Sequence, residues 1–140
     1  MLFRSLVPGG GSAIPTTEDN IHEKLYTLAM RGNEVFRYAV AHMKDSALSL
    51  IERTGIKPEE VNVVIPHQAN LRIINAVAQR LGIPVDRVFI NLQKYGNTSG
   101  AACAIALDEA VRSGKAKKGD IVLMVTFGAG LTWSSAAIRL

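Results

Sequence analysis

The 140-residue sequence predicts an α/β domain built on a mostly parallel sheet. Stretches with helical spacing of apolar residues alternate along the chain with short, almost wholly apolar runs, the pattern of strands that helices cover on both faces. Hydrophobic residues make up 48% of the chain and charged residues 20%, as in an ordinary folded domain. Gly128 and Gly130 separate the last two apolar runs by a tight hairpin, so the final strand is expected to be antiparallel.

Three stretches carry apolar residues at every third or fourth position, which is the spacing of an amphipathic helix. Each is followed by a glycine, Gly55, Gly82 or Gly114, that is suited to end it. Thr98 or Ser99 can cap the start of the third helix. The expected helices cover about residues 33–54, 70–81 and 98–113.

The apolar runs between these helices are predicted strands, and polar or glycine-rich segments separate them. Residues 93–97 are expected to form a polar loop before the third helix. Residues 1–17, rich in glycine and proline, are predicted to be a loop or linker remnant, and residues 18–140 the domain itself. The expected strands are Val61–Pro66, Val88–Leu92, Ile121–Phe127 and Leu131–Arg139.

Composition and charge exclude several kinds of site and location. Cys103 is the single cysteine, so the chain can form no internal disulfide and no metal site of the cysteine-pair type. The net charge of +4 is small and scattered, which does not indicate nucleic-acid binding and suits a modestly acidic partner. No apolar run approaches the ~20 residues needed to cross a bilayer. The N-terminus does not resemble a secretory signal, so a cytoplasmic location is expected.

His67 is the first candidate for chemistry. It directly follows the predicted strand Val61–Pro66, and ligands of open α/β sheets bind beyond the carboxyl ends of the strands. An imidazole at this position can donate a hydrogen bond to a carbonyl or exchange a proton near neutral pH. A histidine satisfied within the fold remains the alternative interpretation.

Asn97 and Phe127 follow the ends of two further strands, and so are expected at the same edge of the sheet as His67. The Asn97 amide can stabilise a developing oxyanion, although an asparagine here can also be a turn residue before a helix. An anion held at the helix start near Thr98 is a third option. Cys103 lies in an alanine-rich helix without an acid or base nearby in sequence, which favours buried packing over nucleophilic chemistry.

Five motifs stand out along the chain: GNEVF (32–36), PHQANLRI (66–73), GNTSGAA (96–102), LDEAV (107–111) and FGAGLTW (127–133). In this order and spacing they resemble the C-terminal half of a β-ketoacyl-acyl carrier protein synthase III over about residues 25–140. That resemblance implies a thiolase-like fold, of which this chain has the C-terminal half only. It also implies an acyltransferase that condenses an acyl-CoA, often acetyl-CoA, with malonyl-acyl carrier protein at the start of fatty-acid synthesis.

The resemblance assigns roles to individual residues. His67 and Asn97 match two members of a Cys-His-Asn triad, whose neutral N–H donors stabilise the enolate formed when the malonyl group loses carbon dioxide. Phe127 matches an aromatic wall that disfavours the malonyl carboxylate. Ala129 stands where the family usually has a glycine whose N–H helps to form the oxyanion hole. No metal or cofactor is implied beyond the CoA and phosphopantetheine substrates. Residues matching the CoA and pantetheine tunnel are Gly32, Phe36, Ala69 and Asn70, and those matching the carrier-protein patch are Arg37 and Arg72.

The sequence lacks the nucleophilic cysteine that the resemblance implies. The family's nucleophilic cysteine belongs to an N-terminal half, and Cys103 lies where the family has packing residues. We therefore expect the 140 residues alone to be inactive and to need an N-terminal half or a second subunit as partner. The central first strand of this half is also expected to be missing. We therefore expect unpaired inner edges and an unstable or associating chain, unless an N-terminal fragment fills the gap or the strands re-pair. A non-catalytic subunit that binds CoA and carrier protein, or a related condensing enzyme of different acyl specificity, remain alternatives.

Overall fold

The structure, a computed structural model, describes residues 5–140 and divides the chain into two compact units, one ending at Tyr38 and one from Ala39 to Leu140. In the first unit, β1 (Ser5–Leu6) pairs antiparallel with β2 (Ala29–Met30). The expected loop over residues 1–17 is thus interrupted by a two-residue strand, and its first four positions lie outside the described residues. The predicted division at residues 17 and 18 stays a prediction.

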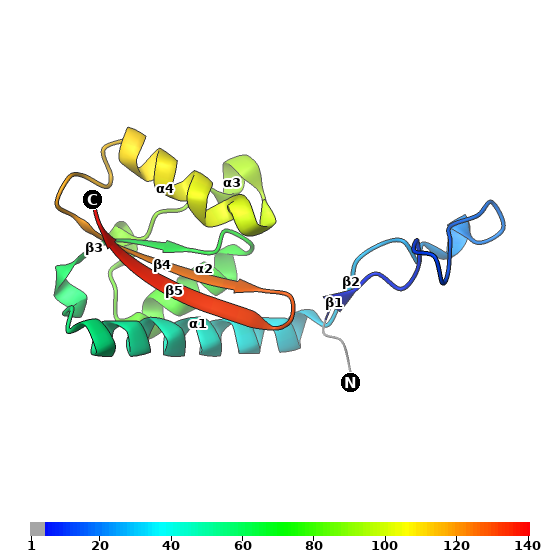
Figure 1. Ribbon diagram of the computed structural model, residues 1–140, viewed down its shortest axis with the longest axis horizontal. Helices are drawn as coiled ribbons and strands as arrows, with labels where there is room; N and C mark the ends of the chain where they lie inside the picture. The colour runs from blue at the N-terminus through cyan, green and yellow to red at the C-terminus, as the bar shows by residue number, and fades with distance from the viewer. Residues whose placement is uncertain (1–4) are drawn as a thin grey trace. The chain divides into compact units, whose positions relative to one another are not determined.

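The second unit is built on the sheet β3 (Val61–Pro66), β4 (Ile121–Gly128) and β5 (Thr132–Arg139), in that spatial order (Figure 1). β3 and β4 run parallel, whereas β5 folds back antiparallel to β4 through the hairpin at residues 129–131. This confirms the mostly parallel sheet with a final antiparallel strand.

The expectation of a missing central strand is wrong. β3 pairs directly with β4, from Val61 opposite Ile121 to Pro66 opposite Val125, and this ladder leaves no position between them. Any further strand must therefore join an outer edge of the sheet, such as that of β5, which pairs only with β4 among residues 5–140. The predicted instability from unpaired inner edges loses its structural basis.

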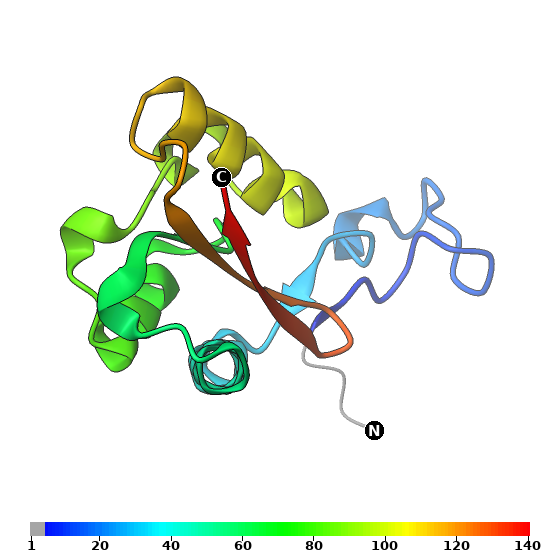
Figure 2. The ribbon, with the colours of Figure 1, turned by 60° about the vertical axis from the view of Figure 1, so that its left-hand side comes forward.

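Helices cover both faces of this sheet. Figures 1 and 2 show α1 (Gly32–Thr54) and α2 (Leu71–Leu81) on one side and α4 (Ala102–Arg112) on the other. As predicted, α2 ends at Gly82, whose φ of 66° lies in the left-handed region that glycine adopts without strain. The side chain of Asn70 caps its start, where Oδ1 accepts a hydrogen bond from the Arg72 N–H at 2.9 Å.

The predicted strand at residues 88–92 is wrong except for one bridge, between Val64 and Val88. The Phe89 N–H still donates to the Val64 carbonyl at 2.9 Å, but the side chain of Gln68 takes over the next ladder positions. The chain then turns into the short helix α3 (Leu92–Tyr95), where a loop was predicted.

The third predicted helix begins later than expected and with a different cap. α4 starts at Ala102, after a 3-10 turn over residues 99–101, and the Thr98 side chain caps neither. Instead, Asn97 Oδ1 accepts the Ser99 N–H at 3.0 Å. The residue predicted for chemistry is therefore also the residue that starts this turn.

Apolar side chains fill both sides of the sheet. Cys103, Ala106 and Ala110 of α4 pack against one face, and their small size lets the helix lie close to the strands. Ile74 and Ala78 of α2 form a second hydrophobic cluster with Val88. No helix within residues 5–140 is long and apolar enough to cross a membrane.

Candidate active site

Of the three strand ends predicted to meet at one edge of the sheet, those of β3 and β4 do so. The His67 N–H continues the ladder beyond β3 and donates to the Val125 carbonyl of β4 at 2.8 Å. Phe127 lies two residues further along β4, at the same edge. The segment from Val88 runs parallel to β3 on its other side and leads through α3 to Asn97.

The His67 side chain is half-buried, and this burial lowers its pKa below the usual value because charging the ring there costs solvation. The ring is therefore neutral at pH 7. Within residues 5–140, the ring makes no side-chain hydrogen bond. A neutral imidazole of this kind has one N–H to offer a bound carbonyl.

Asn97 is exposed, and its amide is divided between two tasks. Its Oδ1 is held by the Ser99 N–H, which leaves the Nδ2 group as a donor toward a ligand. Ser99 itself has a φ of 55°, a left-handed conformation uncommon for a residue other than glycine. Such backbone conformations often accompany functional sites.

Phe127 and Ala129 lie at the β4–β5 hairpin. Phe127 is half-buried and pairs with Trp133 across the ladder. Ala129 is not among the non-glycine residues of positive φ in residues 5–140, which are Lys24 and Ser99. Alanine is therefore accommodated at this position without left-handed strain, and its N–H is retained.

The residues predicted to bind CoA and carrier protein fall on two elements. Gly32, Phe36 and Arg37 belong to the first turns of α1, within the first unit. In the second unit, the Ala69 N–H donates to the His67 carbonyl at 3.0 Å, and Asn70 and Arg72 follow at the start of α2. Ala69, Asn70 and Arg72 are thus close to His67 in the chain.

Sequence reasoning missed three polar residues next to these segments: Gln68, Asn91 and Glu109. Gln68 and Asn91 are the two buried polar side chains of residues 5–140, with 1% and 4% of their surface exposed. A glutamine directly after His67 and an acidic residue within LDEAV were visible in the motifs, but neither could be connected to the other before the fold was known.

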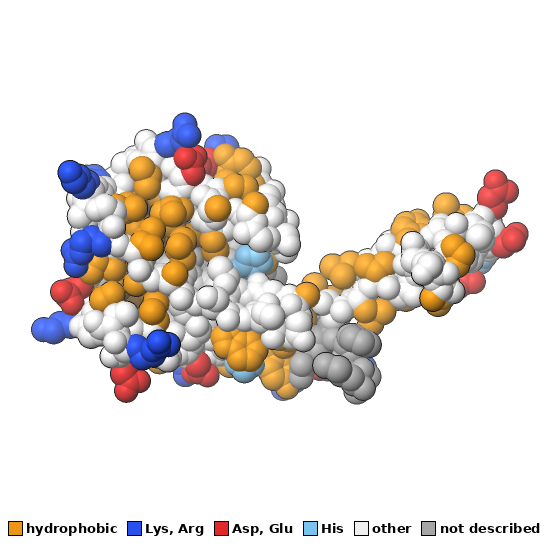
Figure 3. Space-filling view, viewed as in Figure 1, with side chains coloured by type: hydrophobic (Ala, Val, Ile, Leu, Met, Phe, Trp, Pro, Cys, Tyr) orange, Lys and Arg blue, Asp and Glu red, His pale blue; other side chains and the backbone are white. Residues whose placement is uncertain are grey.

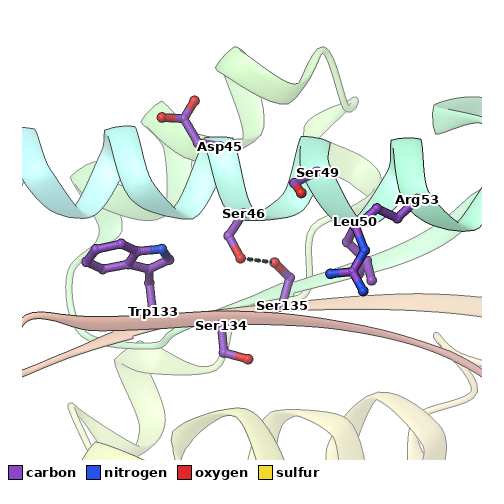
Figure 4. A pocket seen from close by; sticks show the side chains of 8 residues that line it. All are labelled: Asp45, Ser46, Ser49, Leu50, Arg53, Trp133, Ser134 and Ser135. Atoms are coloured by element: carbon purple, nitrogen blue, oxygen red, sulfur yellow. Dashed lines mark hydrogen bonds between the residues drawn. The ribbon is translucent and has the colours of Figure 1, made fainter.

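A groove of about 440 Å³ lies elsewhere, between α1 and β5 (Figure 4). In it Ser46 and Ser135 share a short hydrogen bond. Nearby, the ring of Trp133 stacks on His42 with centroids 3.9 Å apart. None of the predicted site residues lines this groove, so we do not assign the reaction to it. Its walls are Asp45, Ser46, Ser49, Leu50, Arg53, Trp133, Ser134 and Ser135.

Cys103 has the environment of a packing residue, as the sequence predicted. It is 8% exposed, and its Sγ lies 3.9 Å from the Ile65 carbonyl oxygen. Burial raises the pKa of its thiol to about 11. Within residues 5–140, no group of three or more His, Cys, Asp or Glu side chains is placed to hold a metal ion.

We therefore expect Cys103 to resist alkylation. The raised pKa alone lowers the thiolate fraction about 100-fold, because the nucleophile is the thiolate. Iodoacetamide labelling at pH 8, followed by mass spectrometry, should be slow in buffer and fast in concentrated urea. Equal rates in the two conditions would contradict the buried placement of this thiol.

Comparison with known proteins identifies the family. The family model described as 3-oxoacyl-[acyl-carrier-protein (ACP)] synthase III, C terminal, matches residues 51–140. A β-ketoacyl-[acyl-carrier-protein] synthase III of Caldanaerobacter subterraneus subsp. tengcongensis is 52% identical over 133 residues, which cover 95% of this chain and 40% of the relative.

Solved structures agree with this result. The 3-oxoacyl-[acyl-carrier-protein] synthase III of Aquifex aeolicus is 51% identical with a TM-score of 0.80, over 82% of this chain and 37% of that one. The enzyme of the same description from Pseudomonas aeruginosa is 35% identical with a TM-score of 0.83, over 97% and 39%. The chain thus has a thiolase-like fold and spans about two fifths of the length of its relatives. It belongs to the 3-oxoacyl-[acyl-carrier-protein] synthase III family, and it corresponds to the C-terminal part of those proteins.

Proposed function

We propose that these 140 residues form the C-terminal part of an acyltransferase that condenses an acyl-CoA, with acetyl-CoA as the first candidate, with malonyl-acyl carrier protein. The observation that carries this proposal is the neutral, half-buried imidazole of His67 at a strand end, with no hydrogen-bond partner among residues 5–140. In a family of condensing enzymes, that imidazole is available to the thioester of the substrate. The cytoplasm is the proposed compartment, on the sequence grounds given above.

His67 and Asn97 supply the two donors of the proposed mechanism. When the malonyl carboxylate leaves as carbon dioxide, its electron pair moves to the α-carbon and onto the thioester oxygen, which becomes an enolate. The N–H of a neutral imidazole and the Nδ2 group of Asn97 stabilise the charge on that oxygen, and neither group has to give up a proton. The enolate carbon then attacks the acyl thioester on the cysteine, and the thiolate leaves.

Phe127 and Ala129 support the same step. An aromatic wall beside the malonyl carboxylate solvates its charge poorly, which favours its departure as neutral carbon dioxide. The Ala129 N–H is proposed to donate to the oxygen of the acyl thioester when the enolate adds to it.

Substrate and carrier binding are assigned to the two elements that precede and follow β3. Phosphopantetheine is long and narrow, and small residues such as Gly32 and Ala69 allow it close to the backbone. Arg37 and Arg72 are exposed cations suited to an acidic carrier protein. The proposed tunnel residues are Gly32, Phe36, Ala69 and Asn70.

The nucleophile is proposed to come from a partner polypeptide, an N-terminal half or a second subunit. Two features suit such a partner. The outer edge of β5 pairs with no described residue, and Figure 3 shows hydrophobic side chains gathered on the surface between α4 and the C-terminal end of β5. Leu107 of α4, Ile138 of β5 and Leu140 at the C-terminus are partly buried apolar residues.

Complementation tests this function. The 140-residue chain is mixed with an N-terminal polypeptide of a family member that carries the nucleophilic cysteine, and β-ketoacyl-carrier protein is measured by mass spectrometry with acetyl-CoA and malonyl-carrier protein. We expect product from the mixture and none from either part. Product from the chain alone would contradict the proposal, as would a stable complex without turnover, which would identify a binding subunit.

A further inference from the structure

The two buried polar side chains of the described residues are Gln68, which directly follows His67, and Asn91, which starts the segment that leads to Asn97. A buried amide without partners costs free energy, so side chains of this kind persist where their hydrogen bonds are made. Both side chains make hydrogen bonds in this fold, and their partners come from different parts of the chain.

Gln68 joins the end of β3 to the segment beside it. Its Nε2 donates to the Pro66 carbonyl at 2.8 Å and to the Phe89 carbonyl at 3.1 Å. Its Oε1 accepts the Asn91 N–H at 3.0 Å. The residue directly after His67 thereby fixes where residues 89–91 run relative to the strand end.

Asn91 links Gln68 to α4. Its Nδ2 donates to Glu109 Oε2 at 2.8 Å. The other carboxylate oxygen of Glu109 accepts from Lys94 Nζ at 2.5 Å and from the Tyr95 hydroxyl at 2.6 Å. One carboxylate thus holds three side chains of the segment that begins at Asn91 and ends two residues before Asn97.

The carboxylate is suited to this task. Hydrogen bonds lower the pKa of Glu109 to about 2; the bond from Lys94 has the largest effect, followed by those from Tyr95 and Asn91. The carboxylate therefore stays ionised at any physiological pH. Its side chain is 22% exposed, and charge-assisted hydrogen bonds are shorter and stronger than neutral ones.

We propose that Gln68, Asn91 and Glu109 form a polar bridge that sets the position of the Asn97 amide relative to His67, with Glu109 as the positioning residue. This inference rests on the proposed function only for the roles of His67 and Asn97. Two donors that must reach the same oxygen tolerate little error, since a displacement of about 1 Å can cost about 100-fold in rate. Neither donor touches Glu109, so Glu109 acts through α3.

The test uses the full chain labelled with ¹⁵N and three variants: Glu109→Ala, Glu109→Gln and the neighbouring control Asp108→Ala. Asp108 also bears a carboxylate on α4, but it pairs with Arg112 at 2.8 Å, one turn along the same helix. The first readout is the NMR signal of the Asn97 side-chain amide and the exchange rate of the Ser99 N–H.

We expect Glu109→Ala to shift the Asn97 amide signal and to speed exchange of the Ser99 N–H at least about 10-fold, because the α3 segment loses its anchor. Glu109→Gln keeps one acceptor oxygen and should give an intermediate result, and Asp108→Ala should match the unchanged chain. Unchanged Asn97 and Ser99 signals in a folded Glu109→Ala variant would overturn the inference. If that variant does not fold, Tyr95→Phe removes one bond of the bridge and must shift the same signals.

The second readout is turnover in the complemented enzyme. Glu109→Ala should lower kcat about 10- to 100-fold and leave KM for malonyl-carrier protein within about twofold, as expected when donors in the transition state are misplaced. A rise in KM with kcat unchanged would overturn the inference. If the unaltered mixture shows no turnover, the proposed function fails, and the NMR result still decides whether the bridge positions Asn97.

Discussion

Replacing His67 by alanine is expected to lower kcat for condensation about 100- to 1000-fold in the complemented enzyme. This is the typical loss when one preorganised donor to an oxyanion is removed, and burial keeps His67 in the neutral donor form. The measurement is the rate of carbon dioxide release from malonyl-carrier protein, together with formation of the β-ketoacyl product. Partial rescue by His67→Gln, which restores an N–H donor, would support stabilisation of the enolate over proton transfer.

The matched control for this variant is His22→Ala. His22 is exposed and lies in the first unit, on the 3-10 turn Ile21–Glu23, and no role is proposed for it. Its replacement should leave kcat within about twofold of the unaltered chain. A His67→Ala enzyme that retained more than a tenth of the rate would remove His67 from the proposed mechanism.

Replacing Leu123 by alanine should have the largest effect on stability. Leu123 is fully buried in β4, the middle strand of the sheet, where it lies between the parallel and the antiparallel ladder. Large-to-small changes at such positions cost about 2–5 kcal/mol, because the removed methyl groups lose their contacts and leave a cavity. A domain of this kind has about 5–15 kcal/mol in total, so a large part of the free energy of unfolding would be lost.

Urea denaturation followed by circular dichroism measures this loss as a lower transition midpoint at unchanged slope. Leu48→Ala is the control: it makes the same chemical change on α1, where the side chain is 41% exposed. Its free energy of unfolding should stay within about 0.5 kcal/mol of the unaltered chain. Equal effects of the two substitutions would contradict the central position of β4.

Local signals predicted β3 and α2 well. The strand Val61–Pro66 has the bounds expected from its apolar run, and α2 lies between the cap Asn70 and Gly82. The order of strands in space was beyond such signals, because nothing in the chain order says that β4 pairs with β3 without a strand between them. The wrong expectation of a missing central strand arose because the order of the strands in space was not known.

Sequence reasoning named candidate residues at the edge of the sheet, which stay predictions, and it missed the buried polar residues behind them. His67 and Phe127 could be placed at one edge because parallel strand ends share an edge. The bridge through Gln68 and Glu109 escaped because its members are far apart in the chain and each resembles an ordinary surface residue. The same bridge explains why residues 88–92 do not continue as a strand: a side chain occupies the ladder.

Direct pairing of β3 with β4 has a consequence for synthesis of the chain. The paired residues Val61 and Ile121 lie about 60 positions apart, so the parallel ladder cannot form until β4 has left the ribosome. During that interval the edge of β3 that pairs with β4 stays open, and an open apolar strand edge is a state from which chains aggregate. The β4–β5 hairpin, by contrast, needs only local contacts, and once made it offers β3 a ready edge, so the sheet is completed from its C-terminal end.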